Sequence, residues 1–376
     1  MVTRLLYAFS VLLAFLFAPS ATAQSAGELI SADPVVETPG GAQAWRIRYW
    51  TTSEEGQRIE ATGMVVAPRE AAPRQPRKIV AWTHGTSGVV EECDLSDKPG
   101  FFDFTPGLSE MISAGYVVVA PDYPGLGSPV QHAYLVGRET ARSVLDAIRA
   151  ARAIAGAYAG TEFVVWGESQ GGHAALWTAR EAKSYARELN LVGTLAAAPP
   201  TDLGKNLSQA SDANARAFLT AFVAYSWSKR FDAPLDKLFG PLNRGVANAL
   251  AQKCISLESD PKLGTLLGIL SIRNALAGKD IARIDGWSSL IRRNSIKPGD
   301  VPGPVYIAQS VEDSLVAPQV TLEFARGLCR RGRSVQYDSL PGGDHPRTAL
   351  NSTVQSLAWI ADRFAGRRAT GNCGQF

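Results

Sequence analysis

The chain has 376 residues, of which 45% are hydrophobic and 19% charged, and its formal net charge is only +3. This length and apolar content suit one large α/β domain with an insertion, or two domains. The basic residues are scattered rather than clustered, so we expect no nucleic-acid partner.

The first 23 residues have the three parts of an export signal. Arg4 provides a short positive region, residues 5–17 are apolar, and Ala21-Thr22-Ala23 matches a cleavage site of small residues. The apolar stretch is too short to span a bilayer comfortably, and no later segment is long enough to cross one. We therefore expect a signal peptide over residues 1–23 and a secreted or periplasmic mature protein.

Four cysteines follow the export signal: Cys93, Cys254, Cys329 and Cys373. None of them forms a C-x-x-C pair, and an exported chain folds in an oxidising compartment. We therefore expect two disulfides rather than a metal site, and the sequence permits three ways of pairing the four residues.

The first elements of the mature chain are predicted to be strands. Apolar and polar residues alternate over 44–51 and more loosely over 58–66, which predicts an antiparallel hairpin at the edge of a sheet. Residues 78–83 form an apolar run that predicts a fully buried strand, followed by His84-Gly85-Thr86.

Helices and strands alternate in the next part of the chain. Thr105, as N-cap before Pro106, predicts a short helix to Gly115, and residues 116–120 predict a strand. Apolar residues at helical spacing predict a longer helix over 138–155. This alternation implies an α/β fold with a mainly parallel sheet covered on both faces.

A short motif after this helix carries the clearest chemical signal. Four apolar residues from Phe163 predict a buried strand, a helical pattern begins at Ala174, and Gly167-Glu168-Ser169-Gln170-Gly171 lies between them. This order is typical of a nucleophile elbow, whose sharp turn holds the serine at strained backbone angles and needs glycine beside it. The flanking strand and helix make the motif specific, because G-x-S-x-G alone can arise by chance in a chain with 35 glycines.

Residues 191–198 predict another strand, and the pattern then changes. From 201 to 296 it is helical, interrupted by glycine and proline and rich in aromatic residues, which predicts a cap that covers the serine with an apolar pocket. The α/β pattern resumes with a strand, a helix, a strand and a terminal helix (304–308, up to 331, 334–340 and 352–364). We expect three parts in the mature chain: core, helical cap and core again (24–200, 201–296 and 297–376).

A serine hydroxyl needs a base and a carboxylate, and in α/β-hydrolases these follow it in the order acid, then histidine. Two histidines precede Ser169 and a third lies on the elbow helix, which leaves His345 as the base (the others are His84, His132 and His173). Asp313 follows the strand after the cap and is the expected acid, with the adjacent Glu312 as the alternative.

The oxyanion hole should combine two backbone N–H groups. One belongs to Gln170, directly after the nucleophile, and we assign the other to Thr86 in the loop after the first buried strand. His84 should order that loop, and Glu168 should hydrogen-bond neighbouring loops rather than act as acid or base. The sequence has neither an H-E-x-x-H zinc motif nor a phosphate-binding loop, and we expect no cofactor.

At these residues the chain resembles the secretory lipase family, from about Trp82 to the C-terminus. The most specific parts of the resemblance are residues 121–125, 167–172, 312–316 and Asp344-His345. The resemblance implies an α/β-hydrolase core with a large helical lid, and hydrolysis of carboxylic esters and acylglycerols. It also implies the disulfide pairs Cys93–Cys254 and Cys329–Cys373.

The sequence thus predicts an exported serine hydrolase that cleaves carboxylic esters through an acyl-enzyme. Its expected partners are a small-molecule or lipid ester substrate and, transiently, a lipid surface that contacts the cap; no obligate protein partner is evident. Two alternatives stay open at this point: a serine amidase or peptidase on the same fold, and a binding protein without activity.

Overall fold

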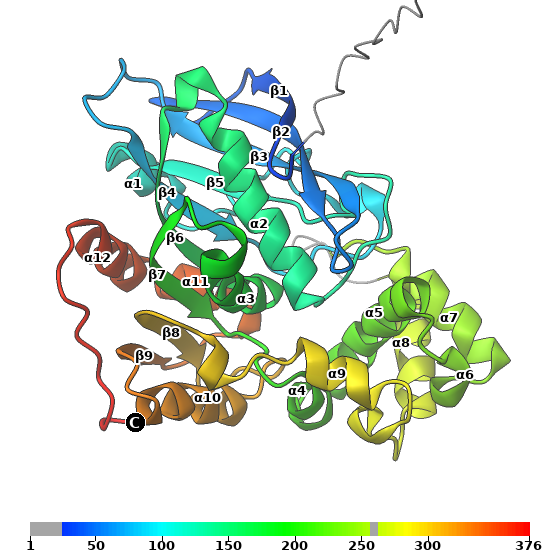
Figure 1. Cartoon of the computed structure of the whole chain (residues 1–376). Helices are drawn as coiled ribbons and strands as arrows, with labels where there is room; N and C mark the ends of the chain where they lie inside the picture. Colours follow the sequence, from blue (N-terminus) through cyan, green and yellow to red (C-terminus); the bar gives the residue numbers. More distant parts are fainter. Residues whose placement is uncertain (1–24, 256–261) are drawn as a thin grey trace, which may run out of the picture.

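The computed structural model of the chain describes residues 25–255 and 262–376. Its centre is a nine-stranded sheet in the order β1-β2-β3-β5-β4-β6-β7-β8-β9 (Figure 1). Strands β4 to β9 pair in parallel, whereas β1, β2 and β3 are antiparallel to their neighbours. The expected signal peptide, residues 1–23, lies outside the described residues.

The strands are β1 Leu29–Val35, β2 Ala42–Thr52, β3 Arg58–Pro68, β4 Arg77–Thr83, β5 Val117–Pro121, β6 Ala159–Glu168, β7 Asn190–Ala197, β8 Val305–Ser310 and β9 Val335–Leu340. The helices are α1 Leu108–Ser113, α2 Gly137–Arg152, α3 Gln170–Tyr185, α4 Leu203–Gln209, α5 Ala213–Phe231, α6 Leu235–Leu238, α7 Pro241–Ala251, α8 Leu263–Ala275, α9 Ser288–Asn294, α10 Pro318–Arg330, α11 Thr348–Asn351 and α12 Thr353–Phe364. Among the residues described, no helix is both long and apolar enough to traverse a bilayer.

The β2–β3 hairpin forms as predicted, but its expected place at the sheet edge is wrong. Strand β1 lies outside it and pairs antiparallel with β2, so that Val35 faces Ala44. The segment carries Asp33 and Pro34 and is only partly buried, so no apolar alternation marked it as a strand. Proline is tolerated there because an edge strand leaves one row of N–H groups unpaired.

The predicted start of the first helix is also wrong. Helix α1 begins at Leu108, after Gly107 in the left-handed region with φ 67°, and Thr105 does not act as its N-cap. The Thr105 hydroxyl instead donates to the carbonyl of Phe101 at 3.1 Å. The chain therefore makes an additional turn before the helix begins.

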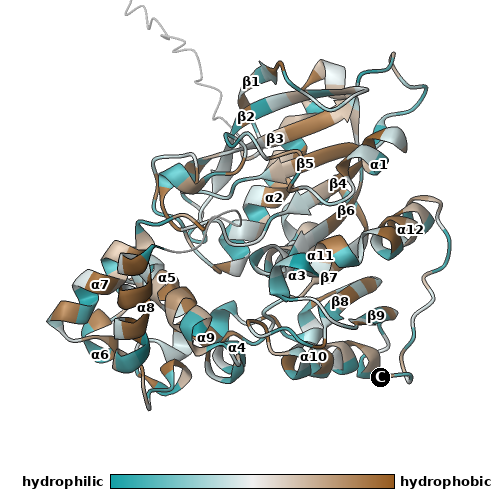
Figure 2. Cartoon of the chain, turned by 180° about the vertical axis from the view of Figure 1, so that it is seen from behind, coloured by the Kyte–Doolittle hydropathy of each residue, from teal (hydrophilic) through white to brown (hydrophobic). Residues whose placement is uncertain are grey.

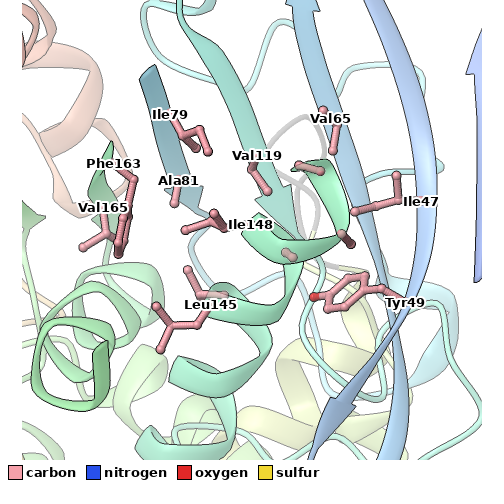
Figure 3. Packing of buried hydrophobic residues seen from close by; sticks show 14 of the residues in the cluster. Ile47, Tyr49, Val65, Ile79, Ala81, Val119, Leu145, Ile148, Phe163 and Val165 are labelled. Carbon is pink, nitrogen blue, oxygen red and sulfur yellow. The ribbon is translucent and has the colours of Figure 1, made fainter. Parts of the chain in front are cut away.

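The sheet is covered on both faces. Helix α2 buries Val144, Leu145 and Ile148 in a cluster on one face. Figure 3 shows Leu145 and Ile148 facing strand residues such as Ile79 and Ala81. The other face packs against α1 and α12. Burying a side chain of this size stabilises the fold by about 1.5–3 kcal/mol, so these layers make the sheet a rigid platform for the loops at its ends.

Between β7 and β8, the described residues form helices α4 to α9, in the stretch for which the sequence predicts a cap. These helices have an apolar core of their own, which includes Phe222, Phe239 and Ile272. Within it, the rings of Trp227 and Trp287 stack with centroids 6.3 Å apart. Figure 1 shows this helical layer beside one end of the sheet.

Both disulfides implied by the resemblance form. Cys93 bonds Cys254 across 161 positions and joins the loop after β4 to the chain after α7. Cys329 bonds Cys373 and joins α10 to the C-terminal tail. The first bond therefore fastens the helical layer to the sheet domain.

Candidate active site

Ser169 stands alone between the end of β6 and the start of α3. Its backbone has φ 55° and ψ −118°, a region that costs a residue with a side chain about 1–3 kcal/mol. The backbone N–H of Ser169 donates to the carbonyl of Ala197 on β7 at 2.9 Å, and this bond holds the turn. The serine is therefore lifted above the carboxyl end of the sheet, at a helix N-terminus.

The glycines on either side of the serine are required because strand β4 passes too close to leave room for a side chain. A Cβ on Gly167 would lie 1.9 Å from the Thr83 hydroxyl, and a Cβ on Gly171 would lie 1.8 Å from the Thr83 carbonyl oxygen. The Thr83 hydroxyl uses this space and donates to the carbonyl of Gly171 at 2.8 Å. Strand β4 and the elbow can touch only because both positions lack a side chain.

His345 and Asp313 are brought together by neighbouring strands. Asp313 follows β8 and His345 follows β9, and these strands are parallel neighbours, so both loops lie at the same edge of the sheet. The Nδ1 atom of His345 lies 2.8 Å from Oδ2 of Asp313. Because a carboxylate can only accept, Nδ1 carries the proton and Nε2 is free to act as a base.

Donors on both carboxylate oxygens hold Asp313 in place. Its Oδ1 accepts from the backbone N–H groups of Leu315 and Val316 at 2.9 and 2.8 Å. Its Oδ2 also accepts from the Gln309 side chain at 2.9 Å. Asp313 is 4% exposed, whereas the alternative acid Glu312 is exposed to solvent. The structure thus brings Asp313 rather than Glu312 to the histidine.

The pKa of His345 reflects two opposed influences. Burial pulls the pKa down, but the hydrogen bond and charge of Asp313, with the carboxyl groups of Glu168 and Asp344, hold it above the ordinary 6.5. An imidazole with a raised pKa is a stronger base toward a hydroxyl proton.

Ser169, Gln170 and His345 line one narrow pocket. Its volume is ≈ 40 Å³, and most of its other lining is apolar and comes from the helical layer and the loop after β8: Leu203, Leu207, Leu219, Val223 and Val316. Among the described residues no hydrogen bond joins the Ser169 hydroxyl to His345. Such bonds often tighten only when substrate is present, so the shared pocket is the relevant observation.

Gln170 lines this pocket, and the loop that carries Thr86 contacts a pocket residue. Gln170 is the first residue of α3, where backbone N–H groups lack a partner within the helix. The loop that carries Thr86 approaches the elbow, because a Cβ on Gly85 would lie 3.8 Å from that of Ser169. The Thr86 hydroxyl is 2.9 Å from the hydroxyl of Tyr134, which fixes the loop against the pocket wall.

The other three histidines are buried, and each donates a ring N–H to a backbone carbonyl. The pairs are His84 with Gly85 at 2.6 Å, His132 with Pro124 at 2.7 Å and His173 with Asn294 at 2.7 Å. Burial lowers the pKa of His132 and of His173 to about 4, so both rings are neutral at pH 7. The bond to Gly85 orders the loop as we expected of His84.

The side chain of Gln170 is a feature that sequence reasoning missed. Its amide nitrogen lies 3.3 Å from Nε2 of His132, and that nitrogen accepts because the other ring nitrogen donates to Pro124. The contact links residues 38 positions apart, and no local pattern signals it. It fixes the side chain of the residue that directly follows Ser169.

The chain is similar to known lipases in sequence and in fold. The model of a family described as "Secretory lipase" matches residues 105–372. Lipase A of Moesziomyces aphidis is 22% identical over 93% of this chain and 78% of its own length. Secreted triacylglycerol lipase LIP5 of Malassezia furfur is 25% identical over 70% of this chain and 72% of its own length.

Among solved structures, the X-ray structure of Candida antarctica lipase A in its closed state is similar to this one. The TM-score is 0.76 at 18% sequence identity, and the match covers 93% of this chain and 85% of that chain. This likeness confirms the predicted fold class: a mainly parallel sheet flanked by helices, as in lipases of the α/β-hydrolase type.

Proposed function

The chain belongs to the secretory lipase family and is a carboxylic ester hydrolase, and from this premise we propose that Ser169, His345 and Asp313 are its catalytic triad. The observation that carries the proposal is the 2.8 Å bond between His345 and Asp313, beside a pocket that His345 shares with Ser169. This is the arrangement that turns a weak nucleophile into a strong one.

The reaction has two halves. In the first, the Ser169 oxygen attacks the ester carbonyl while Nε2 of His345 takes the hydroxyl proton, which it then gives to the departing alcohol. In the second, His345 takes a proton from water, the hydroxide attacks the acyl-enzyme, and Ser169 recovers its proton as the acid leaves. Asp313 stays ionised throughout and stabilises the imidazolium in both halves.

The negative oxygen of each tetrahedral intermediate needs donors that are already in place. We assign this role to the backbone N–H groups of Gln170 and Thr86, which is supported by the helix N-terminus at Gln170 and by the approach of the Thr86 loop to the elbow. Because both donors belong to the main chain, Thr86→Ala should reduce activity far less than replacing Ser169.

The pocket favours apolar acyl groups, and acylglycerols are the substrates that we propose. Its ≈ 40 Å³ is small beside the roughly 300–1,000 Å³ of typical small-molecule pockets, so a fatty acyl chain needs more room than it offers. We propose that this room comes from the wall supplied by α4 and α5, whose Leu203, Leu207 and Leu219 line the pocket.

Helix α8 offers a surface for the transient lipid contact expected of the cap. Figure 2 shows hydrophobic colouring along this helix, and four of its leucines recur at helical spacing with exposed side chains (Leu263, Leu266, Leu267 and Leu270). None of the 13 residues of α8 is acidic. An apolar ridge without negative charge suits the surface of an ester emulsion or a membrane.

The family is secretory, and two disulfides suit a protein that works outside the cytoplasm. We further propose that residues 1–23 are the export signal and are removed. Mass spectrometry of the exported protein would test this, because its first residue should lie close to Gln24.

The triad is tested with a panel of p-nitrophenyl esters of increasing acyl length. Wild-type protein should hydrolyse them and be labelled by a fluorophosphonate at Ser169, whereas Ser169→Ala should lose both properties and keep its melting temperature. Substantial activity in Ser169→Ala, or labelling at another residue, would overturn the proposal. Matched ester and anilide substrates would show whether amides are also cleaved.

A further inference from the structure

Glu168, the last residue of β6, places a carboxyl group directly before the nucleophile. Its Oε1 accepts a hydrogen bond from the backbone N–H of Ala349 at 2.9 Å. Ala349 is fully buried in α11, the short helix that follows the turn His345–Arg347. A side chain of the elbow therefore holds the segment that carries the base, across 181 positions of sequence.

Other hydrogen bonds also hold the segment around His345. The Ser310 hydroxyl donates to the carbonyl of Gly343 at 2.6 Å, before the histidine, and Asp313 holds the imidazole itself. After the histidine, the Glu168 bond is the tie between this segment and the strand that ends in the nucleophile. This bond therefore contributes to fixing the position of His345 relative to the elbow.

We infer that Glu168 is a positioning residue, which anchors the His345 segment to the elbow and directs a second negative charge toward the imidazolium that forms during catalysis. This inference rests on the proposed triad and deepens it. The alternative is a purely structural role, in which the hydrogen bond to Ala349 supports the fold and the charge of Glu168 has no effect on catalysis.

The charges around the base make the two readings distinguishable. Three carboxyl groups face His345: Asp313 on the β8 loop, Asp344 next to it in sequence, and Glu168 on β6, and all three raise its pKa. Burial raises the pKa of Glu168 to about 7, while the histidine charge opposes that rise. Ionisation of Glu168 is thus favoured when His345 becomes charged, which is the moment when a negative charge helps the reaction.

Glu168→Gln separates charge from hydrogen bonding. The amide oxygen can still accept from Ala349, but the negative charge is gone, so the pKa of His345 should fall. We expect the acidic limb of the kcat/KM profile to move to lower pH by roughly 0.5–1 unit. The maximal kcat should fall by about 3- to 30-fold with little change in KM, because the imidazolium loses stabilisation only in the transition state.

Glu168→Leu removes both the charge and the acceptor, so its kcat should fall below that of Glu168→Gln. The matched control is Glu188→Gln, which removes an exposed carboxylate that pairs with Arg149 just before β7, at the opposite end of that strand from the elbow, and should leave the profile unchanged. The melting temperature of each variant shows whether it folds. If Glu168→Leu does not fold, Glu168→Gln alone is enough to test the inference.

The position of the acidic limb in the kcat/KM profile of Glu168→Gln decides whether the inference holds. If the limb of Glu168→Gln coincides with that of wild type, or moves to higher pH, the inference is wrong whatever the Leu variant does. Ser169→Ala measured in parallel separates this result from a failure of the triad: an inactive Ser169→Ala with an unshifted Glu168→Gln profile rejects only the role of Glu168.

Discussion

The side-chain amide of Gln309 donates to Oδ2 of Asp313 at 2.9 Å, and it shares that oxygen with His345. Gln309 is itself 1% exposed and belongs to β8, so the acid of the triad is fixed by the core of the sheet and not only by its own loop. With the two N–H donors on the other oxygen, the carboxylate has no freedom to turn away from the histidine. This rigidity leads to a first prediction.

Asp313→Asn should reduce kcat by about 10³- to 10⁴-fold while the fold is kept. An amide of the same shape leaves the imidazolium without a negative partner and favours the wrong tautomer of His345. Steady-state kinetics on a short p-nitrophenyl ester would measure the loss. Glu312→Gln is the matched control on the adjacent residue and should stay near wild type; the reverse pattern would show that the acid is misassigned.

Gly171→Ala should destabilise the protein by more than about 2 kcal/mol, because the new Cβ would lie 1.8 Å from the Thr83 carbonyl oxygen. Gly245→Ala is the matched control. It lies inside α7 with open space around the new Cβ and should be neutral or stabilise by up to about 1 kcal/mol. Urea titrations of both variants decide the matter, and equal midpoints would mean that the elbow does not need this glycine.

The sequence could predict the parts of the site that have a local signature. Ser169 lies in a strand, a turn and a helix that are contiguous, and His345 could be reached by elimination because the chain has four histidines. The preference for Asp313 over Glu312 agrees with the burial and hydrogen bonds seen in the structure. In each case the order of strands, helices and motifs along the chain was enough to identify the residue.

The features that escaped prediction depend on contacts between distant segments. Strand β1 gains its structure by pairing with β2, and its own residues show no alternation. That Glu168 hydrogen-bonds a neighbouring loop was predicted and is confirmed, but its partner, Ala349, could not be named because the two residues become neighbours only when the sheet closes. The start of α1 at Leu108 follows from the backbone of Gly107, which a capping pattern at Thr105 does not reveal.

The rate should fall as the pH is lowered, with a midpoint above pH 6.5. Catalysis needs neutral His345, and because its pKa is raised by Asp313, the proton is lost at higher pH than from a free imidazole. A profile of kcat/KM between about pH 5 and 9 gives the midpoint, which is an apparent value for the coupled pair of His345 and Glu168. A midpoint below 6.5 would contradict the assignment.

Replacing Cys93 and Cys254 together by serine should lower the free energy of unfolding by roughly 2–5 kcal/mol, because this disulfide closes a long loop between sheet and helical layer. The pair Cys329 and Cys373, which closes a loop of only 44 positions, is the comparison and should lose less. Denaturant unfolding of the two double variants measures both effects. A larger loss at the C-terminal pair would show that strain or tail packing outweighs loop length.

Leu263→Ser combined with Leu267→Ser should reduce hydrolysis of emulsified triacylglycerol by several-fold and leave hydrolysis of a soluble ester unchanged. The two side chains are 72% and 59% exposed on one face of α8, so their removal subtracts apolar area from a lipid contact without opening the core. Val36→Ser, on the far part of the sheet domain and 92% exposed, is the matched control and should affect neither substrate. Binding to vesicles of neutral lipid gives a second readout. Equal loss on both substrates would mean that the leucines support the fold of the helical layer, and no loss on either would remove α8 as the lipid-facing surface.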